Sequence, residues 1–261
     1  MSRTIGLIQT RGIGDIIIAL PIATRFVERG DRVIWPVDSR YRGFFQKAAP
    51  WIEFLDVPHG RFAQDAAEYF HGEPHRILTL RGCDQIFSLY SRLAIPGLDA
   101  VDAGLADSLK FDEYKYALTG VPFLEKWNLR IERDPAREIA LFESLELDAE
   151  YICIHRRGHD HRFEIALPEA WHERYRIVEV DERTESPFDW LYTLEGAAKL
   201  VLVDSCFANL VEQLGLPAEK YFLLRSTVPF TPVLRNAWTF LTVQSGAPAG
   251  AVDEPRAWIA R

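Results

Sequence analysis

Residues 5–21, IGLIQTRGIGDIIIALP, constrain the fold more than any other stretch of the chain. An apolar strand runs into a glycine-containing loop, and the apolar helix that follows begins with Asp15. A strand, a tight loop and a helix in this order are typical of an open α/β sheet, whose ligands bind at the carboxyl edge of the strands. The pattern therefore places the Asp15 carboxylate at such an edge, where it either caps its helix or acts on a ligand.

The rest of the chain repeats the alternation of strands and helices in two halves. A length of 261 residues allows two domains of ordinary size. A less regular, aromatic-rich stretch at 107–133 ends the first half. We place the boundary near residue 147, which gives domains of residues 1–147 and 148–261. The alternation predicts a doubly wound parallel sheet, the α/β class, in each domain.

Apolar runs with glycine and proline stop signals locate the individual elements. Strands are expected at 4–10, 32–37, 51–57, 75–80, 151–155, 176–180, 200–204 and 221–224. Helices are expected at 16–29, 61–71, 84–93, 134–145, 168–174, 188–198, 207–215 and 253–260. The best-defined helix is 207–215, because Gly215 and Pro217 close it.

Composition narrows the class of ligand. A formal net charge of −8 repels a polyanion on average, which weighs against a general nucleic-acid or anionic-membrane binder. Three scattered cysteines, Cys83, Cys153 and Cys206, indicate neither a disulfide framework nor a zinc cluster. No signal peptide and no apolar run of membrane-spanning length is visible. We therefore expect a soluble, cytoplasmic protein with small ligands.

A second junction between a strand and a helix lies in LVLVDSCFANLVEQLG, where Asp204 and Ser205 end a strand. The helix N-terminus beyond Ser205 offers unpaired N–H groups and a partial positive charge, which suit a diphosphate. The alternative is an ordinary Asp or Ser cap.

The segment HRRGHDHR, residues 155–162, follows the first strand of the second half, so its charges lie at the same sheet edge. Arg156, Arg157 and Arg162 suit phosphates, because the guanidinium fork matches oxyanions. A solvated loop is the alternative. A metal site is disfavoured, because the histidines and the aspartate crowd on one loop.

The segment SRYRGFFQK, residues 39–47, mixes basic and aromatic side chains. Arg40, Tyr41 and Arg42 suit an anionic or aromatic acceptor, including a nucleobase. We favour the alternative of a helix with a buried aromatic face and a solvated basic face.

Taken together, these stretches resemble the heptosyltransferase-like glycosyltransferases, family nine of the glycosyltransferases. Gly14 and Asp15, with Pro21 six residues later, are similar to the family's opening GD…P pattern. The run Asp204-Ser205-Cys206…Asn209-Leu210 is similar to its Asp-Thr-Gly…His-Leu signature, with Cys206 in place of the glycine and Asn209 in place of the histidine. The LPEAW stretch at 167–171 resembles a Trp-Pro-Glu-Glu-x-Trp element, but Ile165 lies near the place of the family's lysine.

The resemblance implies the GT-B architecture, two Rossmann-like domains facing across a cleft. The N-terminal domain would bind the acceptor, and the C-terminal domain the nucleotide sugar. It also implies metal-independent transfer with inversion from a nucleoside-diphosphate sugar to an acceptor hydroxyl, with Asp15 as general base and no cofactor beyond that co-substrate. The donor-binding residues that it implies are Thr10, Arg11, Gly12, Gly14, Arg156, Arg157, Arg162, Asp204, Ser205, Cys206 and Asn209. Glu179, Asp181 and Glu182 are weaker candidates for ribose or base contacts.

Three other functions stay open. The fold can serve a nucleotide-sugar-binding protein without chemistry, if Cys206 and Asn209 spoil the donor pocket. It can also serve a transferase that acts on a hydroxylated pyrimidine in DNA. A dehydrogenase is the least favoured, because TRGIGD lacks the GxGxxG spacing. The sequence names neither the sugar nor the acceptor, which can be a carbohydrate, another hydroxyl compound or a modified DNA base.

Overall fold

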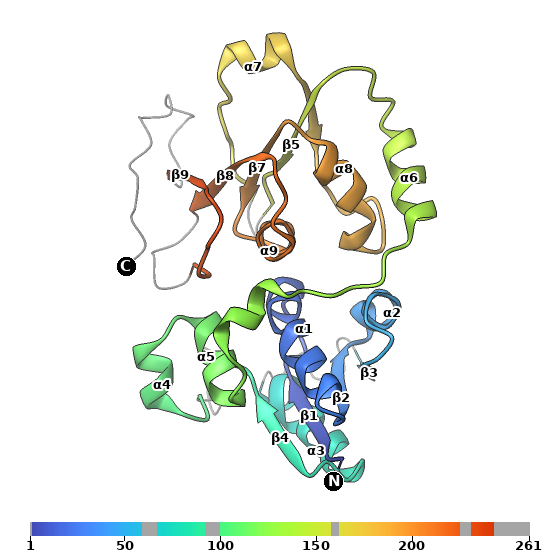
Figure 1. Cartoon of the computed structure of the whole chain (residues 1–261), viewed down its shortest axis with the longest axis vertical. Coiled ribbons are helices and arrows are strands. Elements are labelled where there is room, and N and C mark those ends of the chain that lie inside the picture. Colours follow the sequence, from blue (N-terminus) through green and yellow to red (C-terminus); the bar gives the residue numbers. More distant parts are fainter. Residues whose placement is uncertain (1, 59–66, 92–99, 158–161, 225–230, 243–261) are drawn as a thin grey trace. The chain divides into compact units, whose positions relative to one another are not determined.

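The computed structural model describes residues 2–58, 67–91, 100–157, 162–224 and 231–242. Its internal contacts divide the chain into two compact units, Met1–Glu132 and Arg133–Arg261. The division precedes the expected boundary near residue 147, so the helix expected at 134–145 packs with the second unit. Each unit contains one parallel sheet with flanking helices (Figure 1). Within the described residues, no helix is long and apolar enough to cross a membrane.

The N-terminal unit is built on four parallel strands in the order β3-β2-β1-β4. The strands are β1 (Thr4–Ile8), β2 (Arg32–Asp38), β3 (Glu53–Val57) and β4 (Gln85–Ser88). The helices are α1 (Ile13–Glu28), α2 (Ser39–Ala48), the π-helix η1 (Glu68–Gly72), α3 (Glu73–Leu80), α4 (Ala103–Ser108), α5 (Phe111–Thr119) and the 3-10 helix η2 (Phe123–Trp127). Helix α1 is buried from Ile16 to Thr24 because its apolar run covers almost every side.

Two expected elements of this unit have another secondary structure, and the stretch expected to be irregular contains helix α5. Residues 75–80 form the end of helix α3 rather than a strand, and residues 85–88 of the expected helix 84–93 form β4. A short apolar run is compatible with either a helix or a strand. The helix-start signal at Glu73 and Pro74 favours the helix. Helix α3 packs onto β1 through Leu78, where Gly6 leaves room: a Cβ on Gly6 would lie 2.8 Å from Leu78 Cδ1.

The C-terminal unit is built on five parallel strands in the order β6-β5-β7-β8-β9. The strands are β5 (Tyr151–His155), β6 (Arg176–Glu179), β7 (Lys199–Val203), β8 (Glu219–Leu224) and β9 (Thr239–Thr242). The helices are α6 (Pro135–Ser144), α7 (Glu169–Arg174), the 3-10 helix η3 (Pro187–Trp190), α8 (Leu191–Gly196) and α9 (Cys206–Leu214). Strand β9 was not expected, and the expected helix 253–260 lies outside the described residues.

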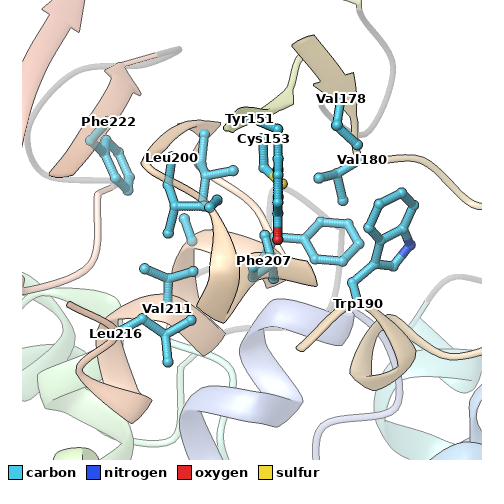
Figure 2. Packing of buried hydrophobic residues seen from close by; sticks show 14 of the residues in the cluster. Tyr151, Cys153, Val178, Val180, Trp190, Leu200, Phe207, Val211, Leu216 and Phe222 are labelled. Atoms are coloured by element: carbon cyan, nitrogen blue, oxygen red, sulfur yellow. The ribbon is translucent and has the colours of Figure 1, made fainter. Parts of the chain in front are cut away.

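The core of the C-terminal unit joins its strands to α9 and η3. Figure 2 shows the buried side chains that meet there, among them Cys153 of β5, Leu200 of β7, Phe207 and Val211 of α9 and Trp190 of η3. Every second residue of β5 and β7 contributes to this cluster, as the two-residue period of a strand requires. Packing against the sheet fixes α9, and with it the turn at 204–206, at the carboxyl end of β7.

Candidate functional site

In the N-terminal unit, the loop after β1 is fixed from several sides. Its Thr10 is buried, with its backbone N and its Oγ1 each 2.9 Å from the hydroxyl of Tyr90. The carbonyl of Thr10 accepts a 2.9 Å hydrogen bond from the backbone N of Asp38, at the end of β2. The backbone N of Arg11 also donates to Tyr90 (3.3 Å). The backbone of the expected site loop is therefore held in one position before any ligand binds.

Asp15 lies in the first turn of α1, at the carboxyl edge of the sheet as expected. The N-cap is Gly12, whose φ of 79° belongs to the left-handed region that glycine tolerates best, and Gly14 lies in the first turn. Asp15 is thus not the N-cap residue. Its Oδ1 lies 3.1 Å from Nζ of Lys115, and its side chain keeps 38% of its surface exposed. A partly exposed carboxylate with a fixed cation on one oxygen can accept a proton from a bound hydroxyl.

Lys115 is the residue of this site that sequence reasoning missed. It lies in α5, within the stretch that the sequence presented as irregular, between the buried Tyr114 and Tyr116. Its Nζ donates to Gln9 Oε1 (2.7 Å) and to the carbonyl of Leu89 (3.0 Å). The sequence signal that could have identified Lys115 is a lysine between two large aromatic residues of a helix, both of which are buried.

The basic residues of α2 are engaged within their own unit. Asp38 caps α2 and accepts two side-chain hydrogen bonds from Arg40 (3.0 and 2.7 Å) and one from the hydroxyl of Tyr69 (2.6 Å). Burial alone would raise the pKa of Asp38, but these hydrogen bonds lower it to about 2. The Arg40 guanidinium also lies over the ring of Tyr41.

The remaining side chains of this segment complete the amphipathic helix that we favoured. Arg42 donates to the carbonyl of Phe54 (3.1 Å) and lies 3.8 Å from Asp56. Phe44 and Phe45 are buried, whereas Arg40 and Arg42 are exposed. The expectation of a buried aromatic face and a solvated basic face is confirmed. The expected acceptor-binding role of Arg40, Tyr41 and Arg42 stays a prediction.

In the C-terminal unit, the turn between β7 and α9 carries the second expected group. Ser205 is the N-cap of α9, yet its side chain caps no N–H group, and its Oγ is buried without a partner among the described residues. The same holds for Oδ1 of Asn209, one turn further along. Asp204 is buried at the end of β7. Cys206 begins the helix, and desolvation raises the pKa of its thiol to about 12.

Two further polar residues, His155 and Arg156, lie at the carboxyl end of the neighbouring strand β5. His155 is buried, with its ring in edge contact with Phe207 of α9 (4.8 Å between centroids). Desolvation and the nearby Arg157 lower the pKa of His155 to about 4, so the imidazole is neutral at neutral pH. In the part of the chain that the structure describes, His155 Nδ1 and Arg156 Nε have no hydrogen-bond partner.

The other two arginines of this segment are ion-paired at the surface. Arg157 binds Glu182 (3.3 Å) and Arg162 binds Glu179 (2.6 Å). Asp181 is held by two hydrogen bonds from Arg183, which lower its pKa. Within this unit, Ser205, Cys206 and Asn209 share the start of α9 with His155 against it, and Arg156 follows His155 at the end of β5. No three His, Cys, Asp or Glu side chains of the described residues are grouped so that they could hold a metal ion.

Comparison with known proteins gives a likeness of fold. No family model matches the sequence, and no curated protein matches it. Among solved structures, ADP-heptose lps heptosyltransferase II from E. coli matches with a TM-score of 0.59 at 13% identity, over 94% of this chain and 91% of that one. A family 9 glycosyl transferase from Veillonella parvula DSM 2008 matches with a TM-score of 0.57 at 12% identity, over 92% and 86%.

This chain has the GT-B glycosyltransferase fold. E. coli heptosyltransferase WaaC with ADP matches as well, with a TM-score of 0.50 at 14% identity, over 92% of this chain and 90% of that one. The expected fold class is therefore confirmed, with a parallel α/β sheet in each unit. At these identities the likeness extends to the GT-B fold alone, and the activity rests on the site residues.

Proposed function

We propose that this chain is a glycosyltransferase that moves a sugar from a nucleoside-diphosphate sugar to an acceptor hydroxyl, with inversion at the anomeric carbon. The acceptor oxygen bonds to the anomeric carbon while the bond from that carbon to the diphosphate breaks. The hydroxyl proton passes to the carboxylate of Asp15, and the nucleoside diphosphate leaves. The exposure of Asp15 and its place at the sheet edge support this role.

One observation in the C-terminal unit carries the proposal: four buried polar atoms, at the ends of β5 and β7 and in the first turns of α9, have no partner among the described residues. They are His155 Nδ1, Arg156 Nε, Ser205 Oγ and Asn209 Oδ1. Leaving such atoms unpaired is costly, so a bound ligand is the natural partner. Arg156 Nε only donates and Asn209 Oδ1 only accepts. A nucleotide sugar offers both counterparts, phosphate oxygens and sugar hydroxyls.

The same end of α9 stabilises the leaving group. As the bond to the sugar breaks, negative charge grows on the diphosphate, and fixed donors lower the energy of that state. The N–H groups of the first turn of α9 and the guanidinium of Arg156 supply such donors. We propose that they neutralise the diphosphate without a metal ion. The rate of transfer is then expected to be unchanged in the presence of EDTA.

Binding is tested first, by thermal unfolding with nucleoside diphosphates and their sugars. Two of the similar structures are an ADP-heptose heptosyltransferase and a heptosyltransferase with ADP, so ADP and ADP-sugars come first in the panel. A ligand of the native state raises the Tm as its concentration exceeds Kd. We expect Asn209→Ala to reduce the rise. A panel in which no nucleotide raises the Tm would contradict the proposal.

The chemical step is tested with the nucleotide sugar that binds, by measuring how fast the nucleoside diphosphate is released from it. Asp15→Asn is expected to lower kcat by about 100-fold or more while the ligand-induced rise in Tm persists. Glu28→Gln is the matched control, because Glu28 is an exposed acid at the other end of α1. If Asp15→Asn keeps the wild-type rate, Asp15 is not the base. Binding without release by the wild type would instead indicate a nucleotide-sugar-binding protein.

A further inference from the structure

Lys115 is a buried lysine at a position where the stability of the fold does not require a charge. Only 2% of its side chain is exposed, and its Nζ lies within 3.1 Å of three oxygens, those of Asp15, Gln9 and Leu89. Two of these contacts are hydrogen bonds, to Gln9 and Leu89, and the third is the ion pair with Asp15. Burying a charge carries a large desolvation cost, and an apolar side chain of similar size is often at least as stable.

A second buried lysine in the same unit provides a comparison. Lys126 is fully buried and donates to Asp112, which is also fully buried (2.7 Å). In that pair each charge compensates the burial of the other. Asp15 is different, because it keeps 38% of its side chain exposed, so water already solvates it. The buried ammonium of Lys115 is therefore directed to a partly exposed carboxylate that does not depend on it for solvation.

The two oxygens of Asp15 have different surroundings. Oδ1 is the oxygen bound by Lys115. Oδ2 lies beside Gly12: a Cβ at that residue would be 2.6 Å from Oδ2, closer than atoms can approach. Because Gly12 has no Cβ, Oδ2 can occupy the space beside it. Lys115 holds the carboxylate in that orientation from the other side.

We propose that Lys115 is a positioning residue, which binds Oδ1 of Asp15 so that Oδ2 is the oxygen that receives the proton of the acceptor hydroxyl. The inference rests on the proposed function, because it assigns a reactive oxygen to the proposed base. Gly12 contributes to the same orientation, because a side chain at this position would displace Oδ2. Proton transfer depends steeply on geometry, so loss of the orientation lowers kcat even when both substrates still bind.

The test compares Lys115→Met with the wild type in turnover and in binding. We expect kcat to fall about 10- to 100-fold, with the KM for the nucleotide sugar and the Tm rise with ADP unchanged. Gly12→Ala is expected to lower kcat in the same way. The matched control is Lys126→Met with Asp112→Leu, which replaces a buried lysine and its partner that form an ion pair of their own, and it is expected to keep the wild-type kcat.

A double variant separates positioning from a structural role. If Lys115 acts through Asp15, Lys115→Met lowers kcat no further in an Asp15→Asn background. A further loss of the same size in that background, or a wild-type kcat for Lys115→Met, would overturn the inference while leaving Asp15 as the base. A wild-type rate for Asp15→Asn would overturn the base assignment itself.

A crystal structure of the Lys115→Met protein tests the orientation without turnover. The Asp15 carboxylate is expected to adopt another rotamer or several. An unchanged position of both of its oxygens would overturn the inference. Should Lys115→Met fail to fold, Lys115→Arg provides the same test, because it keeps a cation but moves its donors; we expect a kcat between those of the wild type and Asp15→Asn.

Discussion

At the scale of single residues, His155 shows how burial changes the chemistry of a side chain. Its imidazole lies against Phe207 at the end of β5, and desolvation lowers its pKa from 6.5 to about 4. Between these two values the unfolded chain binds a proton that the folded chain excludes. Protonation therefore favours unfolding, and the contribution of His155 to stability is lost as the pH falls through this window.

His155→Gln is expected to remove this pH dependence. The free energy of unfolding of the wild type should fall by about 3 kcal/mol more than that of the variant between pH 7 and pH 4. Urea unfolding at several pH values measures the difference. Asp38 does not disturb this comparison. Because its pKa is lowered to about 2, its contribution to the free energy of unfolding is lost mainly below pH 4, and equally in both proteins. Parallel curves for the two proteins would contradict the assignment.

At the scale of elements, a single carboxylate on α9 anchors the segment that leads into β9. Glu212 is fully buried. It accepts hydrogen bonds from the backbone N of Arg235 (2.6 Å), from Asn236 Nδ2 (3.1 Å) and from Trp238 Nε1 (2.7 Å). Charged acceptors make the stronger hydrogen bonds in proteins. The same helix thus carries the candidate donor site on its first turns and fixes the edge of the sheet from its last turn.

Glu212→Gln is expected to destabilise the protein by about 2–3 kcal/mol, because an amide nitrogen would face donors in place of one carboxylate oxygen. Urea unfolding measures the change. Glu150→Gln is the control, since Glu150 forms an exposed ion pair with Arg174 and its loss should cost less than about 1 kcal/mol. Equal effects of the two substitutions would show that Glu212 does not anchor the segment.

The elements that could be predicted from the sequence are those with long apolar runs. Strand β1 with helix α1, and strand β7 with helix α9, follow from such runs and from the glycines beside them. Helix α5 was missed because Lys115 interrupts its apolar pattern. The contacts of Lys115 were also unpredictable, since this lysine is 106 residues from Gln9, its hydrogen-bond partner after β1, and about as far from Asp15, its ion-pair partner. Pattern reasoning located the strand ends but not the side chains that other segments bring to them.

At the scale of the whole molecule, the two units carry different parts of the proposed chemistry. The candidate base lies in the N-terminal unit, and the unpartnered polar atoms lie in the C-terminal unit. Sequence reasoning assigned the acceptor to the first unit and the nucleotide sugar to the second, and this assignment stays a prediction. A ligand that represents only the leaving group is expected to contact mainly the C-terminal unit.

Amide hydrogen exchange with ADP tests this assignment. Protection is expected to be largest in β5 and in the first turns of α9, because a bound diphosphate reduces local opening there. The Ser205→Ala protein, which lacks one of the unpartnered atoms, is expected to show less protection at the same ADP concentration. Protection confined to β1 and the start of α1 would contradict the assignment.

The position of the division between the units matters for anyone who dissects or recombines this chain. Helix α6 belongs to the C-terminal unit: Arg137 binds Asp189 (2.8 Å), and Leu141 packs in the core of that unit. A fragment that starts at residue 148 would lack this helix and leave an apolar surface open to aggregation. Fragments and chimaeras are therefore best joined between Glu132 and Arg133.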